Sequence, residues 1–483
     1  MPDRNANQTP ESLVPDEAAT GDLLRRTAQL AIGWRAGLAS RRVGADPALT
    51  PDALRASLGG PLPQTGSDAW AVVSGLADAA DPGLIAMSGP RYFGFVIGGS
   101  VPAALAADWL TSTWDQNAGL YLATPAAAVV EEVVGDWLVE LLGLPAGTSV
   151  GFATGATMAS TTCLAAARNA VLRSVGWDVE EDGLIGAPRV RVLVGADVHL
   201  SVLMALRYLG LGRGRAERVA TDDQGRMDAD ALAAALEGHS GPLIVCAQAG
   251  EVNTGAFDPF GPIVGLVRRH PGAWLHVDGA FGLWAAASPR LRHRIDGHAG
   301  ADSWATDGHK WLNVPYDSGF AFVRDGAAHR AAMAGSAAYL PEAPGTTRDP
   351  WNYVPELSRR ARGFTAYAAI RELGAQGIAA LVERDHDLAR RMAERLALHP
   401  AVRVINEVVL NQVLVGIDDD DQLTRDVVAR VQREGTTWLG ATTFRGRARM
   451  RVSVSGWHTT PEDIDRSADA ILRCVDETLA GRA

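Results

Sequence analysis

Lys310 is the only lysine in this chain of 483 residues, which also contains 44 arginines. A genome rich in G and C favours Arg over Lys wherever only a positive charge is needed, and this bias explains the arginines. It does not explain the one lysine that remains. An arginine side chain stays protonated, whereas a lysine amine can lose its proton and form a Schiff base with a carbonyl compound. Lys310 is therefore a candidate for amine chemistry.

A second candidate is a turn of small residues, Gly155-Ala156-Thr157, which follows a predicted strand and leads into a predicted helix at 157–173. The N-terminus of a helix offers free backbone N–H groups and the positive end of the helix dipole, and both suit a phosphate group. Thr157 adds a hydroxyl group. A tightly packed start of a helix, without any ligand, is the alternative interpretation of the same residues.

A third candidate is Asp278, directly after a predicted buried strand at 274–277. A buried carboxylate is costly unless it has a positively charged partner. A protonated pyridine nitrogen is one such partner, and a helix N-cap or an arginine salt bridge are the alternatives. A phosphate site, a partner for a pyridine nitrogen and a Schiff-base lysine are together the groups that pyridoxal phosphate (PLP) requires. The sequence therefore predicts PLP as the cofactor.

Further motifs carry a resemblance to a known family. They lie at residues 90–95, 115–117, 125–131, 255–259 and 358–360. These segments resemble signature motifs of the group II amino acid decarboxylases, which include the aromatic amino acid and glutamate decarboxylases. The likeness extends from about residue 90 to 363 and less closely to the C-terminus. It implies the aspartate-aminotransferase fold, called fold type I, and a homodimer with shared active sites.

The resemblance also implies roles for individual residues. His199 matches the histidine that stacks on the cofactor ring, although a histidine at the end of a strand is often purely structural. Ala280 matches a residue that packs on the ring, and His309 and Lys310 match the segment that carries the Schiff base. Tyr339 lies where the family has its lid tyrosine, and a surface anchor in a loop is the alternative.

Two departures from the family pattern concern the cofactor. Asp307 stands where the family commonly has Asn or a small polar residue. A carboxylate pointing at the phosphate would repel it, so we expect Asp307 to face away or to bind a backbone N–H. Glu251-Val252-Asn253 replaces a threonine-rich stretch, and Asn253 is the candidate there for contacting the ring hydroxyl of the cofactor.

The resemblance implies decarboxylation of an L-amino acid to its amine through a Schiff base on Lys310. Tyr339, on a lid that excludes water, would protonate the substrate carbon. In the family, phenylalanine in place of this tyrosine favours oxidative aldehyde formation. Tyr339→Phe is therefore expected to divert the product from amine to aldehyde, which product analysis would detect; only amine at the wild-type rate would contradict this role. An aldolase-like carbon–carbon lyase or an aminotransferase remains the alternative.

The substrate pocket is expected to draw on Phe95, Val96 and Tyr121, together with residues of a second subunit. These side chains favour an aromatic or aliphatic amino acid, although they could equally belong to the core. Arg451, on a predicted C-terminal strand, is of a type that binds a substrate carboxylate in this fold. A salt bridge at the sheet edge is the alternative, and the many arginines leave an acidic substrate open.

The predicted elements indicate an α/β protein. Short apolar runs alternate with helical stretches, which is typical of a mostly parallel sheet covered by helices on both faces. These runs lie at 150–153, 189–194, 243–247, 274–277 and 319–323. We expect a flexible tail at 1–20, a helical N-terminal segment at 21–89, a large PLP-binding domain at 90–350 and a small α+β C-terminal domain at 351–483. Residues 327–350 lack periodicity and are predicted to form a mobile lid.

Composition restricts the partners. The net charge is −11 and no cluster of basic residues stands out, so nucleic-acid binding is not expected. No apolar run approaches the length of a membrane span, and the polar start shows no signal peptide. Three widely spaced cysteines favour reduced core thiols in the cytoplasm over disulfides or a metal cluster. The expected partner is a small amino acid substrate, without a metal ion.

Overall fold

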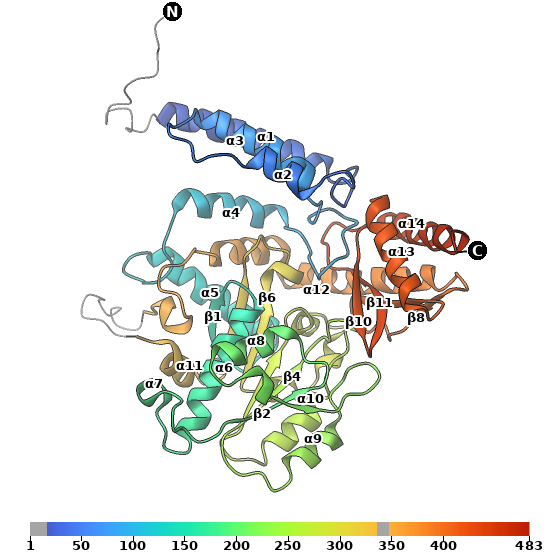
Figure 1. Cartoon of the computed structure of the whole chain (residues 1–483). Helices are drawn as coiled ribbons and strands as arrows, with labels where there is room; N and C mark the ends of the chain where they lie inside the picture. The colour runs from blue at the N-terminus through green and yellow to red at the C-terminus, as the bar shows by residue number, and fades with distance from the viewer. Residues whose placement is uncertain (1–16, 336–346, 483) are drawn as a thin grey trace, which may run out of the picture.

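A seven-stranded sheet forms the centre of the molecule in the computed structural model, which describes residues 17–335 and 347–482 (Figure 1). The strand order is β1-β7-β6-β5-β4-β2-β3, and all neighbours are parallel except that β7 runs antiparallel to β1 and β6. The strands are β1 Ser149–Ala153, β2 Arg191–Gly195, β3 Glu217–Val219, β4 Leu243–Gln248, β5 Trp274–Asp278, β6 Ser303–Asp307 and β7 Gly319–Val323. The expected mostly parallel α/β sheet is confirmed.

Helices cover both faces of this sheet, because successive residues of a strand point to opposite sides. On one face, Val192, Val194 and Ile244 pack against α6 (Ala156–Arg173) and α8 (Leu200–Tyr208). On the other face, Leu193 and Val245 pack in a larger apolar cluster. That cluster includes residues of α5 (Pro125–Leu141), α9 (Ala229–Leu236), α10 (Phe260–Val267) and the first half of α12 (Gly363–Leu396). Strands buried on both faces explain the continuous apolar runs in the sequence.

A separate four-stranded antiparallel sheet lies in the C-terminal part of the chain, with the order β10-β11-β9-β8 (Figure 1). Its elements are β8 Val402–Val404, β9 Gln412–Ile417, α13 Asp421–Glu434, β10 Gly440–Phe444, β11 Arg447–Ser453 and α14 Pro461–Ala480. Helix α12 connects the two sheets, since its second half contributes Leu388 and Met392 to the core of the small sheet. Its helical geometry is interrupted at Gly374, which has φ 62°. The predicted small α+β part is thus present.

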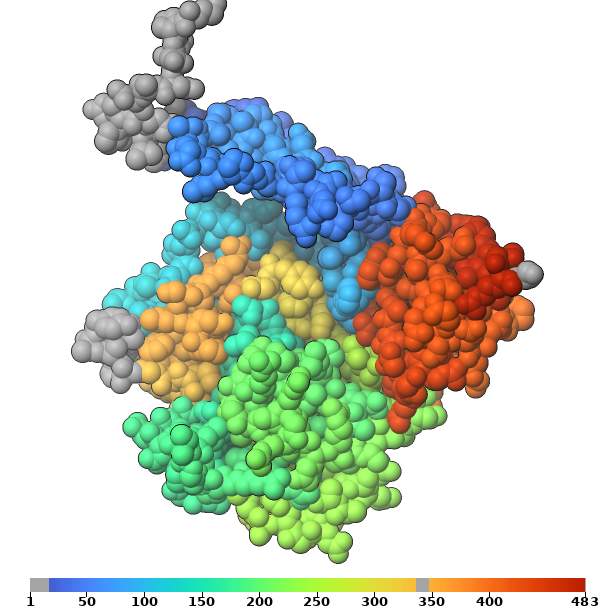
Figure 2. Space-filling model, in the orientation of Figure 1, coloured from blue at the N-terminus to red at the C-terminus, as the bar shows by residue number. Residues whose placement is uncertain are grey.

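The N-terminal helices, which are drawn in blue in Figure 2, form an outer layer over α4 (Pro102–Trp114). They are α1 Glu17–Gly37, α2 Pro51–Leu58 and α3 Ala69–Ala80, and no residue within these three described helices is buried. Large apolar side chains on them and on α4 are exposed, namely Leu24, Ile32, Val72, Leu76, Trp109, Leu110 and Trp114. No described helix is long and apolar enough to cross a membrane.

Several elements differ from the sequence-based expectation. Helix α1 already begins at Glu17, inside the expected tail, and strands β3 and β6 were not foreseen. The first part of 327–350, which was expected to lack its own structure, is helical, because α11 spans Gly326–Met333; the role of the segment as a lid stays a prediction. Asp325 caps this helix, and the buried His329 contacts Ser149 Oγ and the Tyr353 carbonyl. Tyr339 lies outside the described residues.

Candidate active site

A cavity of about 340 Å³ lies at the carboxyl edge of the central sheet, where parallel α/β sheets bind their ligands. Segments that follow β1, β2, β5 and β6 meet there. The residues that line it are Thr154, Gly155, Ala156, Thr157, Met158, His199, Ser201, Ala280, Asp307, His309 and Lys310. The cavity therefore brings together Lys310, the small-residue turn and His199, which are far apart in the sequence.

The turn at Gly155 packs closely against its neighbours. A Cβ atom on Gly155 would lie 3.1 Å from the His309 ring and 3.2 Å from Asp307 Oδ1. A Cβ atom on Gly319, in β7, would lie 2.5 Å from Gly155 Cα. Glycine at both positions lets the start of α6 approach β7 closely. Ala156, Thr157 and Met158, the first residues of α6, line the cavity, at the helix end whose N–H groups have no partner within the helix.

Lys310 lies in a π-helical turn, η7 (Gly308–Leu312), directly after β6. Such turns are rare and frequent at functional sites. The next residue, Trp311, is fully buried, and its Nε1–H donates to Asp385 Oδ2 of α12 at 2.9 Å. This anchor fixes the turn so that Lys310 faces the cavity, with Nζ 2.9 Å from Asp307 Oδ2. Asp307 binds a backbone N–H as expected, that of Ala156, but it faces the cavity as well.

The carboxyl group of Asp385 makes stability depend on pH. It is fully buried, and burial raises its pKa from 3.8 to about 7 despite the nearby Arg384 and the bond from Trp311. Because this pKa is higher in the folded than in the unfolded chain, the folded state is stabilised below about pH 4 and loses that stabilisation as the pH rises to about 7.

Asp385→Asn is therefore expected to flatten the fall in melting temperature between pH 5 and pH 8. The decrease in unfolding free energy that the variant should no longer show amounts to a few kcal/mol, at about 1.4 kcal/mol per pKa unit. Thermal unfolding with excess cofactor at each pH measures it. Asp387→Asn, which changes an exposed carboxylate on the same helix, serves as the control and should leave the slope unchanged. Equal slopes for all three proteins would contradict the assignment.

His309 is held by three neighbours. Its ring stacks on Tyr316 with a centroid distance of 4.2 Å and an interplanar angle of 24°. Nδ1 accepts the Ser318 N–H at 3.1 Å, and Nε2 lies 3.4 Å from Asp307 Oδ1. Burial lowers the pKa of His309, although Asp307 opposes the shift. The imidazole therefore serves as a neutral wall beside Lys310.

His199 forms the N-cap of α8. Its Nδ1 accepts the Ser201 N–H at 3.2 Å and lies 2.7 Å from Ser201 Oγ, while its own backbone N–H donates to Gln248 Oε1. Burial lowers the pKa of His199 more than Asp278 raises it. A neutral, fixed imidazole ring thus borders the cavity. Ser201 was not singled out from the sequence, and its only signal is its place two residues after His199.

Asp278, the last residue of β5, lies next to the cavity and is buried. Its Oδ1 accepts the Ala280 N–H at 3.1 Å and its Oδ2 accepts the Ser201 hydroxyl at 3.4 Å. Both partners are neutral groups that also line the cavity. Asp278 itself is not among the lining residues, so its carboxylate lies directly behind two residues that are, and its expected pairing with a ring nitrogen stays a prediction.

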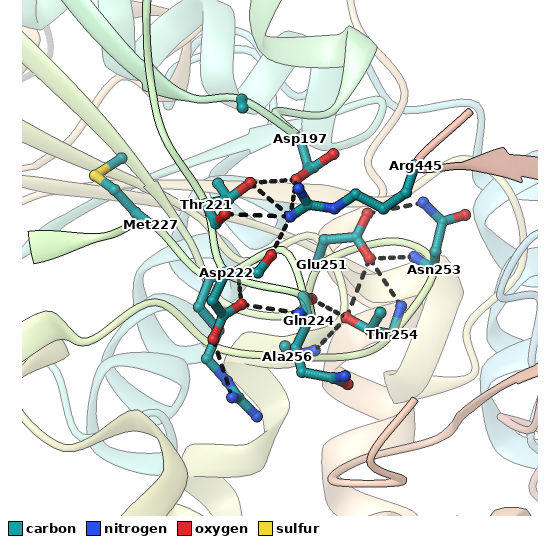
Figure 3. Close-up of polar contacts among 12 residues, drawn as sticks. Asp197, Thr221, Asp222, Gln224, Met227, Glu251, Asn253, Thr254, Ala256 and Arg445 are labelled. Atoms are coloured by element: carbon teal, nitrogen blue, oxygen red, sulfur yellow. Dashed lines mark hydrogen bonds and ion pairs between the residues drawn. The ribbon is translucent and has the colours of Figure 1, made fainter. Parts of the chain in front are cut away.

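Asn253 is directed elsewhere. Its Nδ2 donates to Glu251 Oε1 at 2.8 Å (Figure 3). Its Oδ1 accepts the Thr442 hydroxyl of β10, also at 2.8 Å. Figure 3 also shows Arg445, in the β10–β11 turn, reaching Asp197 and Thr221 in the loops that follow β2 and β3. Asn253 thus joins the two sheets and does not line the cavity, so the expected contact with a cofactor hydroxyl has no support.

The expected substrate residues also lie outside this cavity. Phe95 is 61% exposed and packs beside Trp438, whereas Val96 is 1% exposed and belongs to the core. The Tyr121 N–H donates to Asp349. Arg451 donates to the Val252 carbonyl at 3.1 Å, next to the Glu251 and Asn253 joint. Within one chain, none of these four side chains lines the cavity that contains Lys310.

Comparison with known proteins agrees with this geometry. The profile of the family described as "Pyridoxal-dependent decarboxylase conserved domain" matches residues 51–416. Tryptophan decarboxylase 1 of Oryza sativa subsp. japonica is 28% identical, with 84% of each chain covered. L-2,4-diaminobutyrate decarboxylase of Rhizobium meliloti is 29% identical, with 85% of this chain and 83% of the relative covered.

The fold recurs in a solved structure, that of Oryza sativa TDC with PLP and tryptamine. It has a TM-score of 0.89 at 22% sequence identity, and the match covers 96% of this chain and 99% of the other. Fold type I is thereby confirmed. The family match extends over most of the chain and includes the cavity with its single lysine. The chain therefore belongs to the pyridoxal-dependent decarboxylase family and is a PLP-dependent amino acid decarboxylase.

Proposed function

We propose that this enzyme removes the carboxylate of an aromatic or aliphatic L-amino acid as CO2 and releases the amine, with Lys310 as the residue that carries the cofactor. The observation that carries the proposal is the cavity in which Lys310, His199 and the N-terminus of α6 meet. Its donor set fits PLP: one amine, one helix N-terminus for a phosphate, and a buried carboxylate with neutral partners.

Each wall of the cavity has a proposed task. The turn at Gly155, Ala156 and Thr157 would hold the phosphate, and Asp278 would hold the proton on the ring nitrogen. His199 and Ala280 would enclose the ring. Bound PLP accepts the electron pair left when a bond to the substrate carbon breaks, and this makes the loss of CO2 feasible.

The remaining steps fall to protein groups. The Lys310 amine must leave its ion pair with Asp307 and lose a proton before it can act as a nucleophile. A positive charge near the substrate carboxylate would bind it firmly and oppose the loss of CO2. The imidazoles of His199 and His309 are neutral and therefore add no such charge. Tyr339 is the proposed donor of the proton to the substrate carbon.

We further propose a homodimer, because the substrate residues need a second copy to reach a cavity. Phe95 is exposed, and exposed apolar side chains lie on α1 and α4, among them Leu24, Ile32 and Trp109, of which Ile32 and Trp109 line one groove. Apolar patches of this kind are typical of subunit interfaces. The three cysteines are buried free thiols, which supports a reducing compartment such as the cytoplasm.

The decisive experiment has two parts. Borohydride reduction of the protein with PLP, followed by intact-mass measurement, should add one reduced pyridoxyl phosphate per chain. A panel containing tryptophan, tyrosine, 2,4-diaminobutyrate and glutamate is then assayed for CO2 and amine, since the two relatives named above act on tryptophan and diaminobutyrate. Cofactor attachment without CO2 from any amino acid would overturn the proposed reaction, and glutamate as the best substrate would overturn the substrate class.

A further inference from the structure

Asp307 places a buried carboxylate inside the cavity. It is the last residue of β6 and is 2% exposed. Its Oδ1 accepts the Ala156 N–H at 2.5 Å, and its Oδ2 lies 2.9 Å from Lys310 Nζ. The same side chain therefore touches both the turn assigned to the phosphate and the lysine assigned to the aldehyde of the cofactor.

The bond to Ala156 concerns the helix terminus. Ala156 is the first residue of α6, and its N–H is one of the groups that have no partner within the helix. Such groups and the positive end of the helix dipole are what binds an anion at this position. The Asp307 carboxylate already accepts this N–H. A phosphate that binds at the turn would therefore compete with another negatively charged group for the same donor.

The surroundings do not remove this charge. Within residues 17–335 and 347–482, Lys310 is the one ammonium group in contact with Asp307, and it must give up its proton and its place to react with the cofactor. His309, 3.4 Å away, is the other titratable neighbour in contact, but burial lowers its pKa and favours the neutral ring. If Lys310 bonds to the cofactor aldehyde, its present ion pair with Asp307 would be given up, and the carboxylate would lie beside the phosphate without that ion pair.

We infer that Asp307 is a built-in competitor of the cofactor phosphate, which closes the cofactor-free site through its bonds to Ala156 and Lys310 and weakens the binding of PLP. The inference rests on the proposed function, because it takes the turn at Gly155–Thr157 as the phosphate site. On this inference, Asp307 sets the affinity of the site for PLP. Weaker binding would let the cofactor exchange readily, and the occupied fraction would then depend on the concentration of free PLP.

Asp307→Asn is the direct test, since the amide keeps an oxygen for the Ala156 N–H and loses the charge. Dissociation constants of the cofactor-free protein are measured by titration calorimetry with PLP, inorganic phosphate and pyridoxal, which lacks the phosphate. We expect PLP and inorganic phosphate to bind about tenfold more tightly or better, because a like charge beside the bound anion is gone. Pyridoxal competes with Asp307 only for Lys310, so its binding should tighten clearly less than that of PLP and phosphate, by about threefold or less.

Matched variants keep the result interpretable. Asp317→Asn removes a partly exposed carboxylate that pairs with Arg362 outside the cavity, and it should leave all three constants unchanged. Asp307→Ser removes the same charge with a different shape and should also tighten phosphate binding. Unchanged or weaker phosphate binding in both Asp307 variants would overturn the inference. If pyridoxal binding tightened as much as PLP binding, Asp307 would act through Lys310 alone, and the inferred competition with the phosphate would be wrong. A wild-type protein that takes up no PLP would instead defeat the proposed function.

Discussion

Lys310→Arg is expected to abolish decarboxylation, with a loss in kcat of about ten-thousandfold or more, because it removes the amine on which covalent catalysis depends. The guanidinium group keeps the positive charge and can still pair with Asp307, so the cavity should keep its shape. The loss would therefore report on the amine itself. Steady-state release of CO2, with PLP in excess, measures it.

The composition of the chain gives this variant an unusual control. Since Lys310 is the only lysine, Lys310→Arg has no side-chain amine, and borohydride reduction should add no pyridoxyl phosphate to its side chains. Melting temperature and circular dichroism should match wild type. Activity above about one hundredth of wild type in a folded Lys310→Arg protein would contradict the assignment of Lys310.

The sheet could be predicted where burial follows composition. Strands β4, β5 and β7 consist largely of apolar residues and are buried along their whole length, so an apolar run in the sequence predicts each of them. Strand β6 is equally buried but reads Ser-Trp-Ala-Thr-Asp. Its polar groups are satisfied by distant partners, such as Ser303 by Trp274 Nε1 and Thr306 by the Gly279 carbonyl. A local pattern contains no information about such partners.

The same distinction applies to the cavity. Lys310 and the turn at Gly155 could be expected to lie near each other, because their residue types suit one cofactor at the ends of strands, and both line the cavity. Asp278 lies beside two of the lining residues, Ser201 and Ala280. The orientation of Asn253 could not, since it depends on Thr442, which is 189 positions away on the other sheet. In the proposed homodimer, the places of Phe95 and Tyr121 relative to a cavity would depend on a second copy of the chain, which one sequence does not position.

Asp278→Asn is expected to lower kcat by about a hundredfold to ten-thousandfold, within the range that preorganised charge stabilisation contributes in enzymes. Among the described residues, the hydrogen-bond partners of the carboxylate are neutral, namely the Ala280 N–H and the Ser201 hydroxyl, so its charge would be available to hold a proton on the ring nitrogen of the cofactor. The amide has nearly the same shape but no charge. It cannot favour the protonated ring, and the electron pair from the broken bond is then less well stabilised.

The variants Ser201→Ala and Asp278→Glu separate charge from structure. Ser201→Ala removes one 3.4 Å bond and leaves the carboxylate, so kcat should fall by about tenfold or less. Asp278→Glu keeps the charge and should recover part of the activity lost in Asp278→Asn. If Asp278 were only structural, Asp278→Asn would lower the melting temperature and leave kcat of the folded fraction intact. A kcat that falls while melting temperature and KM stay near wild type instead assigns the effect to the charge, because an interaction made only during bond breaking changes kcat alone.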